Sequence, residues 1–113
     1  MEETKASTVS AEKLRVLIID DEKNIRTTLS LCVEQMGCEV KAVASADAAL
    51  TALHHEPFDL AFLDLRLGEA NGIELIPMLL AESGNLIIVV MTAFATIDSA
   101  VEAIKRGAAD YLP

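Results

Sequence analysis

The segment LRVLIIDDE, residues 14–22, decides the fold class of this chain. Its apolar run is short, rich in β-branched residues and nearly continuous, which is typical of a strand covered on both faces of a parallel sheet. The run stops at Asp20 and Asp21, and a helical pattern of apolar residues follows up to Gly37. The segment therefore predicts a buried strand, a short acidic loop and an amphipathic helix.

The rest of the chain repeats this alternation. Apolar runs predict strands at 38–44, 58–63, 86–91 and from about Ala109, and helical patterns lie between Ser45 and Pro57, at 73–82 and at 96–106. Gly68, Asn71 and Gly72 indicate a loop, and Pro77 predicts a late start or a kink in the helix that follows. Strands that alternate with helices predict an α/β domain with right-handed crossovers and a parallel sheet.

Composition and charge limit the classes of function. The 113 residues suit one domain, and 52% of them are hydrophobic, far above the range of disordered chains. Nine Lys and Arg residues against eighteen Asp and Glu residues give a formal net charge of −9. Nucleic acids and anionic membranes both attract clustered basic residues, so this balance argues against either as a partner.

Residues 1–12 are polar and mixed in charge, and we expect a flexible N-terminal arm before a domain at 13–113. The arm lacks the pattern of a signal peptide, and no apolar run in the sequence approaches the roughly 18 residues of a membrane span. We therefore expect a cytoplasmic protein. Cys32 and Cys38 form no C-x-x-C motif, and we expect buried free thiols there. We also expect core positions for three methionines: Met36, Met78 and Met91.

Chemistry is expected where the strands end, because ligands of open parallel sheets bind outside the carboxyl ends of the strands. Asp20 and Asp21 end the first strand, Asp64 the third and Thr92 the fourth, and the fifth ends near Tyr111. Clustered carboxylates repel one another, and a hard cation such as Mg²⁺ relieves that repulsion. An aspartate beside Mg²⁺ is also a credible nucleophile toward phosphorus, with a hydroxyl to hold the phosphoryl oxygens.

Each residue also has a purely structural explanation. Asp20 or Asp21 can cap the following helix, and Asp64 and Thr92 can belong to ordinary turns. Their joint occurrence at the strand ends favours a site. By contrast, a group of other polar residues is expected to be exposed and without a binding role: His54, His55, Glu69 and the guanidinium of Arg66.

Four sequence motifs occur in order along the chain: VLIIDDE at 16–22, DLAFLDLRLGEANG at 59–72, VVMTAFA at 89–95 and AIKRGAADYLP at 103–113. Together they resemble the receiver domain of two-component response regulators, over about residues 14–113. The segments LDLRLG (63–68) and GAADYLP (107–113) are most similar to those of NtrC-type receivers, which regulate σ54-dependent transcription. The resemblance implies a flavodoxin-like (CheY-like), doubly wound five-stranded parallel sheet with strand order 2-1-3-4-5.

The resemblance also implies a role for each site residue. Asp64 matches the phosphorylated aspartate, and Asp20 and Asp21 match the acidic pair that holds Mg²⁺ together with the backbone carbonyl of Arg66. Thr92 and Ala93 match the hydroxyl and the small residue beside the phosphoryl group. Tyr111 matches the aromatic switch residue, which turns inward when the hydroxyl of Thr92 is drawn toward the phosphate.

The implied function is a phosphorylation-controlled switch rather than an enzyme with a diffusible substrate. The phosphoryl donor would be a phosphohistidine on a sensor histidine kinase. The switch would control an output domain of the full-length protein, which we expect to be transcriptional, and we also expect a homodimer.

The sequence departs from the family at its end. Receivers have a lysine just after the residue that Pro113 matches, followed by a fifth helix, and both are absent from this chain. We therefore expect poor phosphorylation of these 113 residues compared with a longer chain. We also expect an apolar strip on the sheet beside the first helix, which would favour self-association.

Three other functions fit the sequence less well. One is a degenerate receiver that acts only as a protein-interaction module, against which the intact acidic residues argue. Another is a phosphatase with an aspartate nucleophile, but those enzymes have a second carboxylate two residues later, where this chain has Arg66. A flavin site would need a phosphate-binding loop after the first strand, where two aspartates stand instead.

Overall fold

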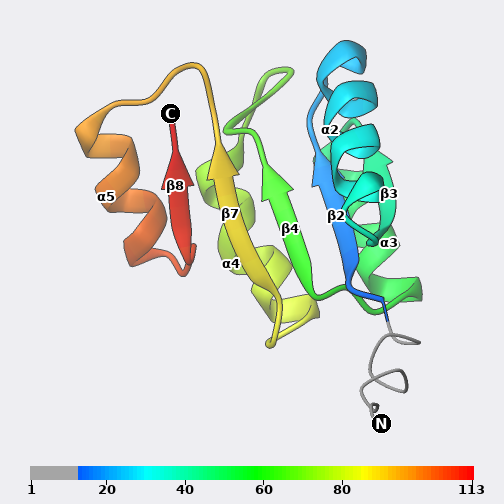
Figure 1. Cartoon of the computed structure of the whole chain (residues 1–113). Coiled ribbons are helices and arrows are strands. Elements are labelled where there is room, and N and C mark those ends of the chain that lie inside the picture. The colour runs from blue at the N-terminus through cyan, green and yellow to red at the C-terminus, as the bar shows by residue number, and fades with distance from the viewer. Residues whose placement is uncertain (1–12) are drawn as a thin grey trace, which may run out of the picture.

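The computed structural model describes residues 13–113, so the arm expected at 1–12 lies outside the described residues. Strands and helices alternate along the chain, as Figure 1 shows. The elements are β2 (Arg15–Ile19), α2 (Lys23–Gln35), β3 (Glu39–Val43), α3 (Ala46–His55), β4 (Leu60–Leu63), β5 (Arg66–Leu67), β6 (Ala70–Asn71), α4 (Gly72–Glu82), β7 (Ile87–Met91), α5 (Ile97–Lys105) and β8 (Asp110–Leu112).

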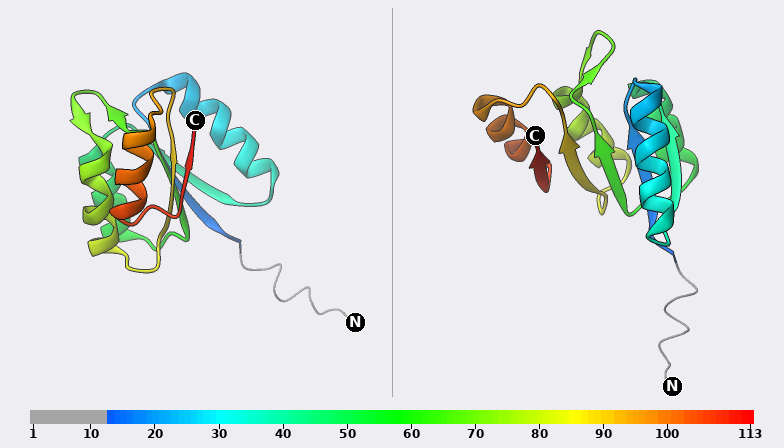
Figure 2. Two further views of the ribbon diagram at one scale, coloured as in Figure 1. Left: turned by 90° about the vertical axis from the view of Figure 1, so that its left-hand side faces the viewer. Right: turned by 45° about the horizontal axis from the view of Figure 1, so that its top comes forward.

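The main sheet has five parallel strands in the order β3-β2-β4-β7-β8. In chain order this is 2-1-3-4-5, which confirms the predicted flavodoxin-like fold. Helix α2 covers one face of the sheet, and α3, α4 and α5 lie on the other (Figure 2). All five carboxyl ends therefore meet at one edge, the upper edge in Figure 1.

Strand alternation divides the core into two layers. Leu17 and Ile19 of β2 are fully buried against the α3 and α4 side. Val16 and Ile18, which point the other way, pack with Val33 of α2. Burial of one such aliphatic side chain contributes about 1.5–3 kcal/mol, so β2 anchors both layers and fixes where its acidic end lies.

Polar caps define the starts of three helices. Ser45 Oγ accepts the backbone N–H of Ala48 (3.1 Å), and Asn71 Oδ1 accepts that of Ile73 (3.0 Å). Thr96 Oγ1 accepts the N–H of Ser99 in the same way, at 3.0 Å. Each cap contributes about 1 kcal/mol to helix stability.

Two local predictions were wrong. The loop expected around Gly68 contains a short antiparallel hairpin of β5 and β6, too brief to show any periodicity in the sequence. Helix α4 begins at Gly72, so the late start predicted from Pro77 is wrong, and the alternative of a kink at Pro77 stays a prediction. Asn71 caps the helix early, and the proline removes only one backbone donor from it.

The predicted burial of the sulfur-containing residues is also largely wrong. Cys32 is exposed and Cys38 is half-buried. Met36 and Met78 are exposed, and Met91 is half-buried. Val33 is the buried residue of α2, and Cys32, which directly precedes it, points away from the core. Met36 lies at the C-cap, beyond the last helical turn.

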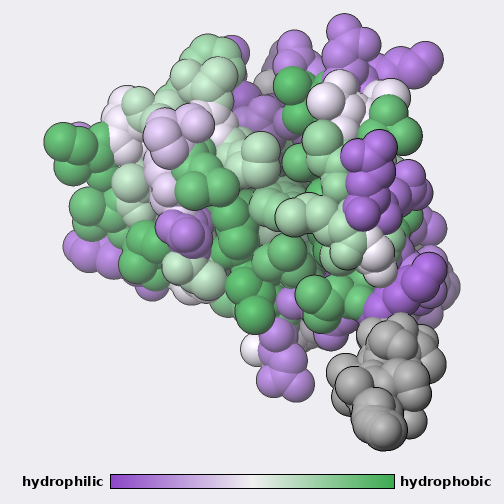
Figure 3. All heavy atoms as spheres, viewed as in Figure 1, coloured by the Kyte–Doolittle hydropathy of each residue, from purple (hydrophilic) through white to green (hydrophobic). Residues whose placement is uncertain are grey.

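One face of the sheet is partly open. Ile87 of β7 and Leu112 of β8 are 51% and 41% exposed, and Ile25 of α2 is 40% exposed. Figure 3 shows hydrophobic residues across the sheet between α2 and α5. This is the apolar strip that the sequence predicted.

Within residues 13–113, no helix combines the length and hydrophobicity needed to span a membrane.

Candidate functional site

Three carboxylates meet at the carboxyl edge of the sheet. Asp20 and Asp21 follow β2, and Asp64 follows the neighbouring strand β4. One oxygen from each carboxylate lies within 4.8 Å of the other two. The cluster predicted from the sequence is therefore present, because adjacent parallel strands deliver their ends to the same place.

Asp20 is the most buried of the three, at 8% exposure. Its Oδ1 accepts the backbone N–H of Glu22 (2.9 Å), and Arg26 Nη1 donates to its backbone carbonyl (2.9 Å). Burial raises the pKa of Asp20 above its ordinary value, and the charges of Asp64, Asp21 and Glu22 add to this, whereas the Glu22 hydrogen bond opposes it. The N-cap residue of α2 is Glu22, and its side chain makes no capping hydrogen bond. Neither Asp20 nor Asp21 is therefore the N-cap of α2.

Asp21 ties the first acidic loop to the hairpin. Its Oδ2 accepts the backbone N–H of Gly68 at 2.8 Å, across 47 positions of sequence. Gly68 has φ +61°, in the left-handed region that favours glycine, which lets the hairpin turn toward Asp21. The hairpin therefore borders the cluster.

Asp64 is held by backbone contacts on several sides. Its N–H donates to the Ile19 carbonyl (3.0 Å), and its Oδ1 accepts the Arg66 N–H (3.2 Å). Gly72 packs so closely that an added Cβ would lie 2.8 Å from the Asp64 carbonyl oxygen. The start of α4 thus supports the backbone of Asp64 directly.

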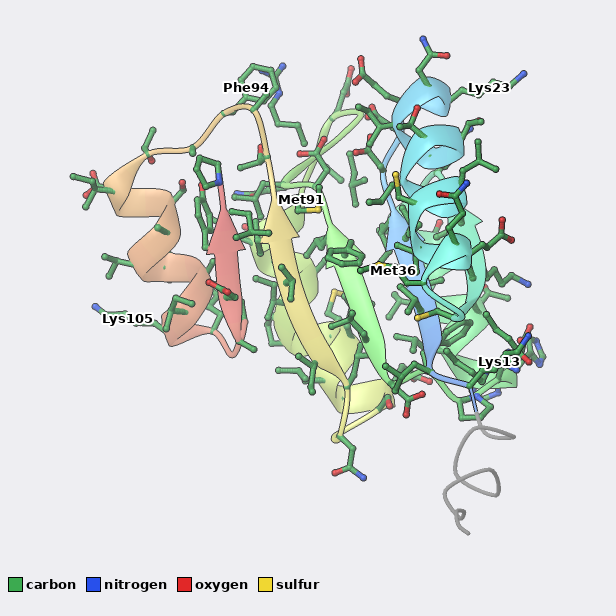
Figure 4. The ribbon with its side chains drawn as sticks, in the orientation of Figure 1. Lys13, Lys23, Met36, Met91, Phe94 and Lys105 are labelled. Carbon is green, nitrogen blue, oxygen red and sulfur yellow. The ribbon has the colours of Figure 1, made fainter. Side chains whose placement is uncertain are left out.

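Thr92 follows β7, the next strand of the sheet, and is 6% exposed. Its Oγ1 accepts the Phe94 N–H (3.2 Å), which leaves its own proton free for another acceptor. A pocket of about 230 Å³ is lined by Asp20, Asp64, Thr92 and Ala93 at its polar end, and it continues along the open sheet face to Met91, which Figure 4 labels. Four of the predicted site residues therefore line one pocket, whereas Asp21, Arg66 and Tyr111 are not part of its lining.

The chemistry of this donor set fits a divalent cation. Oxygen ligands of one Mg²⁺ at about 2.0–2.1 Å are roughly 3–4 Å apart, so carboxylates within 4.8 Å need only small rotations to share the ion. A cation would also relieve the repulsion that the three carboxylates share. His54 and His55 are exposed on α3, outside the lining of this pocket, and His54 Nδ1 lies 3.5 Å from Glu82 Oε1.

A family model for the response regulator receiver domain matches residues 16–113. This chain belongs to that family. The receiver is 45% identical over 98 residues to the alginate biosynthesis transcriptional regulatory protein AlgB of Pseudomonas putida, a match that covers 87% of this chain and 22% of the relative. The receiver thus spans about a fifth of the length of the curated relatives that it matches.

Solved structures agree with the fold. A response regulator from Burkholderia pseudomallei, with a phosphorylated aspartic acid, a calcium ion and citrate, is 35% identical, with a TM-score of 0.86 over 88% of this chain and 59% of that chain. The beryllofluoride-activated NtrC4 receiver domain dimer is 30% identical, with a TM-score of 0.81 over 87% of this chain and 81% of that one. The relatives place this receiver among those of NtrC-type regulators.

Two contacts of the receiver were not predicted. The Arg66 guanidinium, expected to be idle, lies 4.1 Å from the ring centroid of Phe94, in the loop that leaves β7 at the top of Figure 4. Arg66 and Phe94 each lie two residues after a strand-end site residue, and β4 and β7 are neighbours, so the equal offset could have indicated the contact. The hydroxyl of Tyr111, on β8, lies 2.5 Å from Ser99 Oγ on α5.

Proposed function

We propose that this receiver accepts a phosphoryl group on Asp64 and that phosphorylation switches an output domain of the full-length protein. The observation that carries this proposal is that carboxylate oxygens of Asp20, Asp21 and Asp64 lie within 4.8 Å of one another. Asp20 and Asp64 also line a pocket together with Thr92. A carboxylate nucleophile, a cation site and a hydroxyl donor are the groups that phosphoryl transfer requires.

The three carboxylates and the backbone carbonyl of Arg66 would hold Mg²⁺. When bound, the ion would neutralise charge on the transferring phosphoryl oxygens. Within that site, an Asp64 oxygen forms a bond to phosphorus while the phosphorus–nitrogen bond of the donor phosphohistidine breaks, and the electron pair leaves with the imidazole. The Thr92 hydroxyl donates to a phosphoryl oxygen, and the small side chain of Ala93 leaves room for the group.

We propose a sensor histidine kinase as the donor. Tyr111 would act as the switch residue that follows the displacement of Thr92. Control of transcription is supported by the names of the relatives, which include transcriptional regulatory proteins. A homodimer is supported by the dimer of the NtrC4 receiver.

A phosphatase with an aspartate nucleophile is less well supported. The position two residues after Asp64 belongs to Arg66, whose guanidinium packs on Phe94 and cannot serve as a carboxylate acid–base group. A degenerate receiver is disfavoured because the three carboxylates lie within 4.8 Å of one another, and Asp20, Asp64 and Thr92 line one pocket.

The proposal is tested by incubating the full-length protein with acetyl phosphate and Mg²⁺ and measuring its intact mass. We expect the addition of one phosphoryl group, its loss in the Asp64→Asn variant, and its suppression by a chelator. Asp59→Asn is the matched control, because Asp59 precedes β4 at the opposite end of the same strand. Labelling that persists in Asp64→Asn would place the reaction elsewhere, and an unlabelled wild type would contradict the proposal.

A further inference from the structure

Ser99 joins two parts of the receiver that are separate in sequence. Its hydroxyl lies 2.5 Å from the hydroxyl of Tyr111, on β8. The same hydroxyl also belongs to the capping box of α5, because Ser99 Oγ accepts the Thr96 N–H at 3.1 Å. Tyr111 is half-buried and packs on the main core, so its hydroxyl is anchored to the first turn of α5.

The hydrogen-bond capacity of Ser99 settles which group donates. A serine hydroxyl has one proton and two lone pairs. Ser99 gives its proton to the Thr96 carbonyl (3.0 Å) and uses one lone pair for the Thr96 N–H. Tyr111 therefore donates to the remaining lone pair. The Thr96 hydroxyl, also 3.0 Å from Ser99 Oγ, competes for that same lone pair.

This competition makes an exchange possible. If the hydroxyl of Tyr111 leaves, the Thr96 hydroxyl can donate to Ser99 in its place, and the capping box stays satisfied. Helix α5 then keeps its cap whether or not Tyr111 is bound. Release of the tyrosine costs about one hydrogen bond and does not require the helix to fray.

The other end of the same loop is tied to Thr92. Thr92 Oγ1 accepts the Phe94 N–H at 3.2 Å, and the loop then runs to Thr96, which caps α5. A movement of Thr92 thus acts on a segment whose far end holds Tyr111 through Ser99.

We propose that Ser99 is a positioning residue of the switch. Its hydroxyl holds Tyr111 at α5 in the unphosphorylated receiver. On phosphorylation this contact breaks, and the Thr96 hydroxyl donates to Ser99 in place of Tyr111. This inference rests on the proposed function, in which Tyr111 turns inward toward Thr92. It predicts that loss of the Ser99 hydroxyl favours the activated state.

The chain offers a direct probe, because it contains one tyrosine and no tryptophan. Tyrosine fluorescence anisotropy therefore reports Tyr111 alone. Beryllofluoride with Mg²⁺ serves as the phosphoryl mimic, and calorimetry measures its affinity in every variant. The variants are Ser99→Ala, Ser99→Thr, which keeps a hydroxyl, and Tyr111→Phe, which removes the donor and leaves the capping box intact.

We expect Ser99→Ala to lower the anisotropy of Tyr111 without beryllofluoride and to tighten beryllofluoride binding about two- to tenfold, the equivalent of one hydrogen bond. Ser99→Thr should behave as wild type. In the Tyr111→Phe background, Ser99→Ala should leave the affinity unchanged, because the contact is already absent. An effect that arose only from helix capping would persist in that background.

The proposal fails if Ser99→Ala changes neither the anisotropy nor the affinity, or if its effect on affinity survives in Tyr111→Phe. A wild type that binds no beryllofluoride in the presence of Mg²⁺ would instead contradict the proposed function. In that case the anisotropy of Ser99→Ala still reports whether Ser99 anchors the tyrosine, so the two failures are distinguishable.

Discussion

At the scale of single residues, Asp20 shows how the sheet edge prepares a cation site. The carboxylate is nearly buried, one hydrogen bond from the Glu22 N–H reaches it, and Asp21 and Asp64 add negative charge close by. Burial and repulsion both destabilise its charged form. The fold thus holds three carboxylates close together, and a divalent cation would relieve the repulsion between them.

Replacing Asp20 by Asn should therefore separate stability from ion binding. We expect Asp20→Asn to stabilise the metal-free receiver at pH 7 by about 1 kcal/mol, the repulsion between two unit charges 4 Å apart in a water-like medium. The amide oxygen can still accept the Glu22 N–H. The same variant should bind Mg²⁺ at least about tenfold more weakly. Urea unfolding with and without Mg²⁺ measures both effects, and destabilisation of the metal-free variant would contradict the explanation.

The same residue predicts a pH dependence. The pKa of Asp20 is raised by folding, so between the unfolded value of 3.8 and the folded value the native state binds more protons than the unfolded state. The contribution of Asp20 to stability is therefore greatest below the unfolded pKa and is lost as pH rises through the folded pKa. The unfolding free energy of wild type minus that of Asp20→Asn should fall as pH rises through this window and then stay level. A difference that rises with pH would reverse the assignment.

At the scale of elements, the start of α4 is packed against the end of β4. A Cβ at Gly72 would meet the Asp64 carbonyl oxygen and the Leu65 Cα, both at 2.8 Å and both backbone atoms that cannot rotate away. We expect Gly72→Ala to destabilise the receiver by about 1–3 kcal/mol and to weaken Mg²⁺ binding, because Asp64 must shift. Gly84→Ala is the matched control, since no atom lies within 4 Å of its added Cβ. Equal unfolding free energies for the two variants would argue against this packing.

The hairpin and the β7–α5 loop are joined by Arg66 and Phe94. We expect a coupling free energy of about 0.5–1 kcal/mol between Arg66→Ala and Phe94→Ala in a double-mutant cycle of stability, the usual size of an exposed cation–π contact. Arg66→Gln, which keeps most of the side-chain length without the charge, should lose most of that coupling. Strictly additive single variants would show that the stacked geometry contributes nothing.

The elements that the sequence predicted well are those with a strong period. Strand β2 and helix α5 lie within one or two residues of their predicted ranges, and the strand order fixed which acidic residues would meet. The features that were not predicted depend on tertiary contacts. The β5–β6 hairpin is two residues long on each side, and the pairing of Ser99 with Tyr111 spans twelve positions and two element types. Neither leaves a periodic signal, because each is decided by tertiary packing.

At the scale of the whole molecule, two properties of the surface oppose each other. The chain carries a formal net charge of −9, which keeps copies apart. The open sheet face presents Ile87 and Leu112, with Ile25 at its border, and such a patch favours association. The balance between them should depend on ionic strength, because salt screens charge repulsion but does not weaken burial of apolar surface.

We therefore expect reversible self-association that increases with both protein and salt concentration. At about 1 M salt the Debye length falls to roughly 3 Å, so the repulsion between copies is nearly removed. Ile87→Glu, at the amino end of β7 on the open face, should reduce the associated fraction in sedimentation velocity. Val101→Glu adds the same charge on α5, where Val101 is 48% exposed, and should have the smaller effect. If both variants reduce association equally, net charge rather than the open face controls it, and a wild type that stays monomeric up to millimolar concentration in high salt would show that the face does not associate.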